Sequence, residues 1–161
     1  MTSFRRACLV SEGFGRFDDA ELRRLNAPLR FTPAICLLGT AAAIATRSPG
    51  LLLVLAAAAA TAVATRRHPF DLLWEYIVRP AIGGPHMPKA PCPRRFAFVM
   101  ATPVLTGAGL SLALGAEAFA FSLAALQLAG CATYVLTGWC GASVVYRKFV
   151  RRNSLPQTLA A

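Results

Sequence analysis

Four apolar stretches separated by polar segments dominate the pattern of this 161-residue chain. They cover roughly residues 28–46, 51–66, 97–115 and 119–146. A helix needs about 20 apolar residues to cross the hydrocarbon core of a bilayer. The pattern therefore predicts an all-α polytopic membrane protein with four transmembrane helices, whose membrane domain covers residues 17–149. The second stretch is short and rich in alanine, so it either crosses the membrane with help from its flanks or forms a re-entrant hairpin.

The polar segment 67–96 contains a second, shorter periodicity. Apolar residues recur at helical spacing between residues 69 and 79, with polar residues on the opposite face. This pattern predicts an amphipathic helix that lies along the cytoplasmic membrane surface. We expect the apolar face to turn toward the bundle or the lipid, and the polar face to carry an exposed ion pair four residues apart. The apolar face includes Phe70, Leu73, Trp74 and Ile77, and the polar face includes Asp71, Glu75 and Arg79.

Residues at both ends of this helix suggest where it starts and stops. His68 is expected to cap it, Pro69 suits the first helical position, and Asp71 lies near its positive end. Pro80 is expected to end it. Gly83, Gly84 and Pro85 then open a proline-rich stretch that runs to residue 93, which predicts a stiff extended strap. Arg94 and Arg95 mark the entry to the third apolar stretch.

The two ends of the chain look different from each other. Residues 1–16 are expected to form a flexible cytoplasmic arm. Residues 17–26 predict a short lead-in helix, because Asp18 followed by Glu21 makes a capping box. Residues 150–161 are expected to form a cytoplasmic tail.

Basic residues predict the orientation. Six of the 17 Lys and Arg residues lie before or at the start of the first stretch, six lie between Arg66 and Arg95, and four follow the last stretch, whereas Arg47 alone lies in the first loop. Cytoplasmic loops carry such an excess. We therefore expect a multi-pass protein of the bacterial inner membrane with both termini cytoplasmic. The net charge of +10 then favours anionic inner-leaflet lipids as partners and not nucleic acid, because the charges flank apolar spans.

Candidate chemistry is sparse. The five cysteines contain no C-x-x-C pair, and no ligand spacing predicts a metal site or a cofactor site. No nucleophile, phosphate or dinucleotide motif predicts an enzyme. Cys140, near the cytoplasmic end of the last stretch, is the best candidate for a reactive thiol, although a small buried side chain is the simpler interpretation.

Several blocks of sequence resemble the bacterial domain-of-unknown-function 4395 family over roughly residues 22–149. They are Arg24-Leu25-Asn26-Ala27, His68-Pro69-Phe70-Asp71, Arg79-Pro80 with Gly83-Gly84-Pro85, and Arg94-Arg95-Phe96. The resemblance implies a small four-span inner-membrane protein. It also hints at thiol or sulfur handling, with a thioredoxin-like or sulfurtransferase-like partner. Many members carry Phe-Cys-x-Gly-Cys at the end of the last span, and here Cys140 matches the first cysteine while Ser143 stands in place of the second.

Three functional hypotheses follow. The first is a non-enzymatic scaffold or accessory subunit that presents its cytoplasmic loop to a membrane-protein partner. The second is a thiol or sulfur relay that uses Cys140. The third is a small-solute channel or transporter formed by an oligomer. An open cleft around Cys140 would favour the relay, and apolar packing around it would favour the scaffold.

Overall fold

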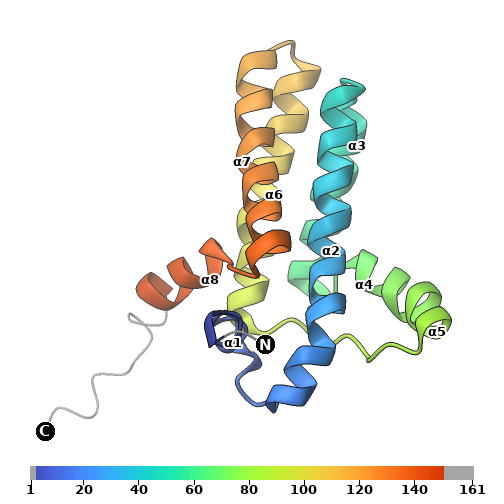
Figure 1. The fold of residues 1–161 in the computed structure, drawn as a ribbon. Coiled ribbons are helices and arrows are strands. Elements are labelled where there is room, and N and C mark those ends of the chain that lie inside the picture. The colour runs from blue at the N-terminus through green and yellow to red at the C-terminus, as the bar shows by residue number, and fades with distance from the viewer. Residues whose placement is uncertain (1–2, 151–161) are drawn as a thin grey trace, which may run out of the picture.

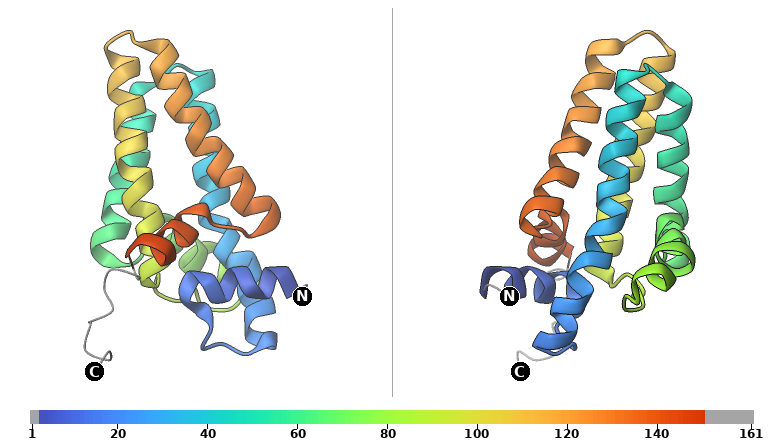
Figure 2. Two further views of the ribbon diagram at one scale, coloured as in Figure 1. Left: turned by 90° about the vertical axis from the view of Figure 1, so that its left-hand side faces the viewer. Right: turned by 45° about the vertical axis from the view of Figure 1, so that its right-hand side comes forward.

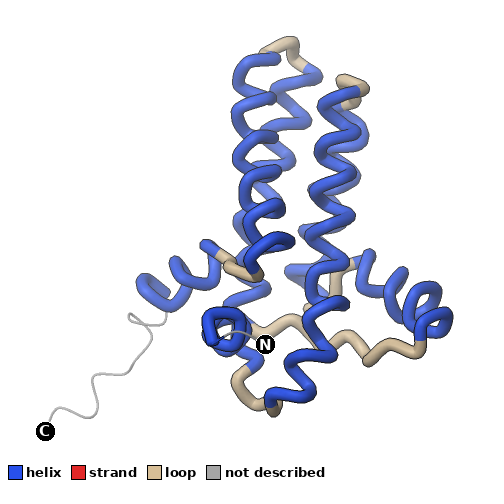
Figure 3. The backbone as a smooth tube through the Cα atoms, viewed as in Figure 1, coloured by secondary structure: helices blue, strands red, loops and turns tan. Residues whose placement is uncertain are grey.

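Four long helices form an antiparallel bundle in the computed structural model, which describes residues 3–150 (Figure 1). They are α2 (Asp19–Ala45), α3 (Pro49–Thr65), α6 (Cys92–Ala113) and α7 (Glu117–Thr137). The shorter helices and both ends of the described chain gather at one end of the bundle, and two tight turns occupy the other (Figure 3). At that far end, Arg47 pairs with Glu117 at 2.8 Å and links the two turns.

Length and hydropathy give three to four candidate membrane spans. Helices α2, α6 and α7 are each long and apolar enough to cross a membrane. Helix α3 meets this requirement only together with residues Pro69–Ile82, which are bent away from it by 83°. The prediction of an all-α polytopic membrane protein is therefore confirmed. Helix α3 packs mainly against α6, and Ala56, Ala59 and Ala62 are buried, as close approach of membrane helices requires.

The N-terminal segment is not the free arm expected over residues 1–16. Residues Ser3–Leu9 form α1, and Val10–Phe14 form a π-helical turn, η1. Figure 2 shows α1 lying across the end of the bundle. Leu9 and Phe14 are buried in one apolar cluster with Leu22, Leu29 and Trp74, which explains why the segment is anchored.

The lead-in helix and the first span are one helix. Asp18 caps α2 as expected, since its carboxylate accepts from the N–H groups of Ala20 and Glu21, and Glu21 accepts from the N–H of Asp18 at 3.0 Å. Pro28 does not separate the two segments, because it lies inside α2. A proline removes one backbone hydrogen bond, which packed membrane helices tolerate.

The surface helix and the strap follow α3 in the expected order. The helix is built from α4 (Pro69–Leu73), the π-helical turn η2 (Trp74–Val78) and α5 (Arg79–Ile82). It continues past Pro80, which occupies an early position of α5, and ends where Gly83 adopts a φ of 63°. The extended residues after Gly83 then run back beneath the bundle to α6 (Figure 1).

The fourth stretch is not one helix to Tyr146. Helix α7 ends at Thr137, because Gly138 has a φ of 75° and donates its N–H to the carbonyl of Tyr134 at 2.8 Å. Such a left-handed glycine is a common helix terminator. A second helical segment, α8 (Gly141–Val145) with the π-helical turn η3 (Tyr146–Val150), then turns away from the bundle (Figure 1). The tail expected over 150–161 lies outside the described residues beyond residue 150.

Candidate functional site

A cavity of about 640 Å³ lies between α2, α6 and α7, toward the end of the bundle where the short helices gather. Most of its lining is apolar and comes from α6 and α7. Glu12 of η1 also lines it, as do Trp139 and Cys140 before α8 and Gly141 and Ala142 at the start of α8, so both departures from the expected fold contribute to its wall.

A buried polar cluster joins four elements at this cavity. The hydroxyl of Tyr134 donates to Glu12 Oε2 at 2.9 Å, and Arg94 Nη1 lies 3.9 Å from the same oxygen. Arg94 also donates to the carbonyl of Leu29 at 2.9 Å and to the Tyr134 oxygen at 3.4 Å. The cluster therefore connects the N-terminal segment to α2, α6 and α7.

Glu12 is the most unusual member of this cluster. Its side chain is 1% exposed, and its Oε1 atom has no hydrogen-bond partner among the residues that the structure describes. Burial raises the pKa of Glu12 to about 7, although Arg94 and the Tyr134 hydroxyl both act in the opposite direction. Near neutral pH this carboxyl group can therefore gain or lose a proton.

A second polar cluster lies beside the first. The His68 ring accepts from the N–H of Phe70, and Asp71 Oδ2 accepts from the N–H of His68 at 2.9 Å, so the expected cap is confirmed. Asp71 Oδ1 also accepts from the Thr32 hydroxyl at 2.5 Å. Asp71 is buried and therefore does not lie on an exposed polar face. Burial lowers the pKa of His68 to about 4, with Asp71 opposing this shift and Arg94 adding to it.

The two shifted groups predict opposite effects of pH on stability. His68 has a folded-state pKa below its ordinary 6.5, so its contribution to the free energy of unfolding rises as pH increases from about 4 to 6.5. Glu12 has a folded-state pKa above its ordinary 4.5, so its contribution to the free energy of unfolding falls as pH increases from 4.5 to about 7. Each slope approaches about 1.4 kcal/mol per pH unit inside its window.

We therefore expect little change in the thermal midpoint of the detergent-solubilised protein between pH 5 and 6.5. Glu12→Gln should give a midpoint that rises with pH, and His68→Asn, which retains a capping side chain, one that falls. The same pH profile in both variants would contradict the assignment of these two groups.

Three cysteines of the five line the cavity: Cys36 from α2, Cys131 from α7 and Cys140 from the connection to α8. Gln127 donates to the Cys131 sulfur at 3.4 Å. All five cysteines are free thiols. Cys140 precedes α8 and so lies at a helix N-terminus, not inside the C-terminal part of a long span. Burial still raises the pKa of Cys140, with Ser143 and Arg94 in part opposing the shift, which disfavours the reactive thiolate.

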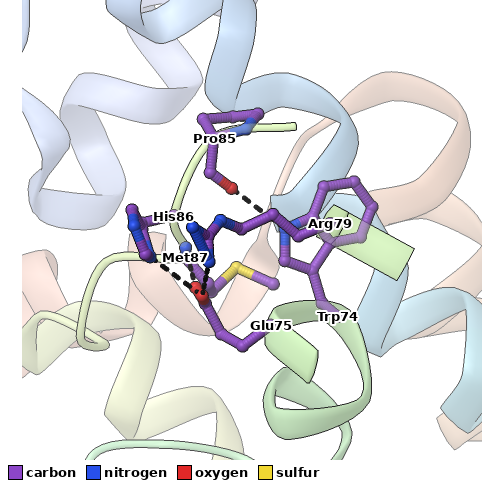
Figure 4. Close-up of polar contacts among 6 residues, drawn as sticks. All are labelled: Trp74, Glu75, Arg79, Pro85, His86 and Met87. Carbon is purple, nitrogen blue, oxygen red and sulfur yellow. Dashed lines mark hydrogen bonds and ion pairs between the residues drawn. The ribbon is translucent and has the colours of Figure 1, made fainter. Parts of the chain in front are cut away.

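The strap is held firmly against the surface helix (Figure 4). Trp74 Nε1 donates to the carbonyl of Pro85 at 3.1 Å. Glu75 Oε1 accepts a hydrogen bond from the N–H of Met87. The other carboxylate oxygen, Oε2, lies 2.9 Å from His86 Nδ1 and 3.4 Å from Arg79 Nη1. Burial alone would raise the pKa of Glu75, but these three partners together lower it.

This arrangement corrects the expected faces of the helix. The Glu75–Arg79 pair forms, yet Glu75 is buried because the strap folds back over it. On the apolar face, Trp74 is buried as expected, whereas Leu73 and Ile77 are not covered by the bundle, so their expected contact with lipid stays a prediction.

The candidate site residues of the sequence fall into two groups. The first group lies near the cavity and contains His68, Phe70, Asp71 and Arg94. The second group lies where the strap contacts the surface helix and contains Trp74, Arg79, Gly84 and Pro85. Pro69 and Gly83 lie at ends of the helical segments between them. Arg95 donates to the carbonyl of Val63 and ties α6 to α3.

The burial of Glu12 was not predicted, because its neighbours Ser11 and Gly13 give no signal and only Val10 and Phe14, two residues away on either side, are apolar. Tyr134 carried a usable signal, as a polar residue inside an apolar stretch. Across residues 3–150, no group of three His, Cys, Asp or Glu side chains is placed to hold a metal ion.

Comparison with known proteins gives one match. No curated protein and no solved structure matches the chain. The family model described as "Domain of unknown function (DUF4395)" matches residues 26–151, which includes Arg94, Tyr134 and Cys140 but not Glu12. The chain is therefore a membrane protein with three to four candidate spans, and it belongs to the DUF4395 family.

Proposed function

We propose that this protein is a non-enzymatic component of the bacterial inner membrane that binds a small, mainly apolar molecule in the cavity between α2, α6 and α7. The main support for this proposal is the size and lining of the cavity. Its volume of about 640 Å³ falls within the range of small-molecule sites, about 300–1,000 Å³. Its lining also has the usual composition of such sites, a largely apolar wall with a few converging polar groups.

The other hypotheses have less support. The scaffold hypothesis relied on a loop available to a partner, but Met87 and Ala90 of the strap are buried and Ala90 donates to the carbonyl of Arg66. These contacts favour a structural role for the strap. Cys140 lines the cavity, as a thiol relay would need, yet its raised pKa opposes reactivity. The relay with a thioredoxin-like or sulfurtransferase-like partner and the oligomeric channel stay predictions.

A cavity-filling variant tests ligand binding. Gly130 lines the cavity, and a Cβ atom placed there would meet no neighbour within 4 Å, so Gly130→Leu should fill the space without a clash. Gly50 is equally unhindered but lies at the other end of the bundle, so Gly50→Leu is a matched control.

The probe is a long-chain alcohol that carries a photoreactive diazirine, added to membrane vesicles and located by mass spectrometry of peptides. We expect Gly130→Leu to reduce labelling of cavity-lining residues at least three-fold relative to lipid-facing residues such as Leu38. Gly50→Leu should leave the distribution unchanged. Equal labelling of the cavity in both variants would overturn the proposal.

The proposed orientation has a separate test with a membrane-impermeant maleimide. Ala116 is exposed at the two-turn end of the bundle, and native Cys92 is exposed at the opposite end. We expect Ala116→Cys to react in intact cells, whereas Cys92 should react only after the membrane is permeabilised. Reaction of Cys92 in intact cells would reverse the orientation.

A further inference from the structure

Glu12, which lines the cavity, has a carboxylate oxygen that nothing in the described chain satisfies. Glu12 lines the cavity, and its Oε2 atom already accepts from Tyr134 and lies near Arg94. Its Oε1 atom is buried without a hydrogen-bond donor. An unsatisfied buried acceptor is costly, and a donor from a ligand would remove that cost. Oε1 therefore favours a ligand group that donates a hydrogen bond.

The charges around this position also lack a cation. Among residues 3–150, Glu12 and Asp71 are two buried carboxyl groups, and the guanidinium of Arg94 is buried with them. Asp71 and Glu12 both act electrostatically on Arg94. His68 adds no charge near neutral pH, because its pKa is about 4. With both carboxyl groups ionised, these residues sum to one negative charge, and buried charges require compensation.

An anionic ligand would fit poorly here. The Arg94 guanidinium is already directed at the carbonyl of Leu29, the oxygen of Tyr134 and Glu12. A carboxylate or phosphate head group would have to displace these contacts and would lie beside Glu12.

Resting on the proposed function, we propose that the molecule bound in the cavity is a lipophilic amine, whose ammonium group donates a hydrogen bond to Glu12 Oε1 while its apolar part occupies the space between α6 and α7. A charge-assisted hydrogen bond of this kind is stronger than a neutral one, especially away from water. The proton is the natural competitor of the amine for this carboxylate.

Several titratable or charged groups act on Glu12 or on its partners, and a pH experiment must take account of them. They are Cys8 of α1, Arg94 of α6, Tyr134 of α7, Cys140 before α8, Arg30 of α2 through Tyr134, and His68 and Asp71 through Arg94. An alkylammonium remains protonated below about pH 10, as a lysine side chain does. Ionisation of Glu12 therefore dominates the change in amine binding between pH 6 and 8.

The test compares two diazirine probes of equal chain length, one with a primary ammonium head and one with a hydroxyl head. In wild-type vesicles at pH 8, we expect the ammonium probe to label the cavity at least five-fold more strongly than the hydroxyl probe. Unlabelled decylamine should compete better than decanol. The preference should fall as pH is lowered to 6.

Two variants complete the experiment. Glu12→Gln retains the size of the side chain and should abolish the ammonium preference, whereas Glu117→Gln, at the far end of the bundle, should preserve it. Should Glu12→Gln fail to accumulate, the pH dependence in the wild type still decides the question.

Equal cavity labelling by both probes, unaffected by pH, would overturn the amine assignment and leave the proposed function standing. Failure of the proposed function has a different signature, because Gly130→Leu would then fail to reduce labelling by either probe.

Discussion

Replacing Arg94 by methionine is expected to lower the free energy of unfolding by about 3–5 kcal/mol, the usual cost of removing one partner of a buried ion pair. Arg94 is 7% exposed and contacts Glu12, Tyr134 and the carbonyl of Leu29, so the change leaves a buried carboxyl group uncompensated. Reversible unfolding in mixed micelles, followed by circular dichroism, measures the loss.

Two further variants isolate the cause. Arg47→Met removes a guanidinium whose pair with Glu117 is largely exposed, and it should cost no more than about 1 kcal/mol. The double variant Glu12→Gln with Arg94→Met should recover part of the loss, since it removes the buried charge that Arg94 neutralises. A loss that stays the same in the double variant would show that Arg94 acts by packing and not by charge.

Glu75→Ala is expected to cost about 1–3 kcal/mol, because it leaves the buried N–H of Met87 without an acceptor and removes the contacts to His86 and Arg79. An exposed pair on the polar face of a surface helix would predict almost no effect. The same unfolding assay measures the difference.

The matched control for Glu75 is Glu117→Ala, which removes a carboxylate from an exposed ion pair and should cost at most about 1 kcal/mol. We also expect Glu75→Ala to detach the strap, and faster proteolysis between Gly83 and Pro91 would detect this. Equal losses in the two variants, with no change in proteolysis, would contradict the role of Glu75 as the anchor of the strap.

Local signals in the sequence predicted local structure well. Apolar stretches located the long helices, and the caps at Asp18 and His68 form as expected, because each depends on contacts within three residues. The proline-rich strap is extended for a similarly local reason, since proline fixes its own backbone angle.

Contacts between distant residues could not be predicted in this way. Glu75 sits on the polar side of its own helix, and only the return of the strap beneath the bundle buries it. Gly138 lies within an apolar run, so periodicity gave no reason to end the helix there rather than at Gly130, which remains helical. The cavity likewise depends on where η1 and α8 pack, and neither is encoded by a repeat along the chain.

The docking of the N-terminal segment also has a consequence for the order of assembly. Glu12 is synthesised 122 residues before Tyr134, the residue that donates to it, so its site is complete only after the last long helix has emerged from the ribosome. Leu9 and Phe14 can pack against Leu22, Leu29 and Trp74 earlier, but until then the carboxyl group of Glu12 lacks the Tyr134 hydroxyl. Completion of the cavity is thus a late step of biogenesis. A chain that stops before residue 134 lacks the hydroxyl group that binds Glu12.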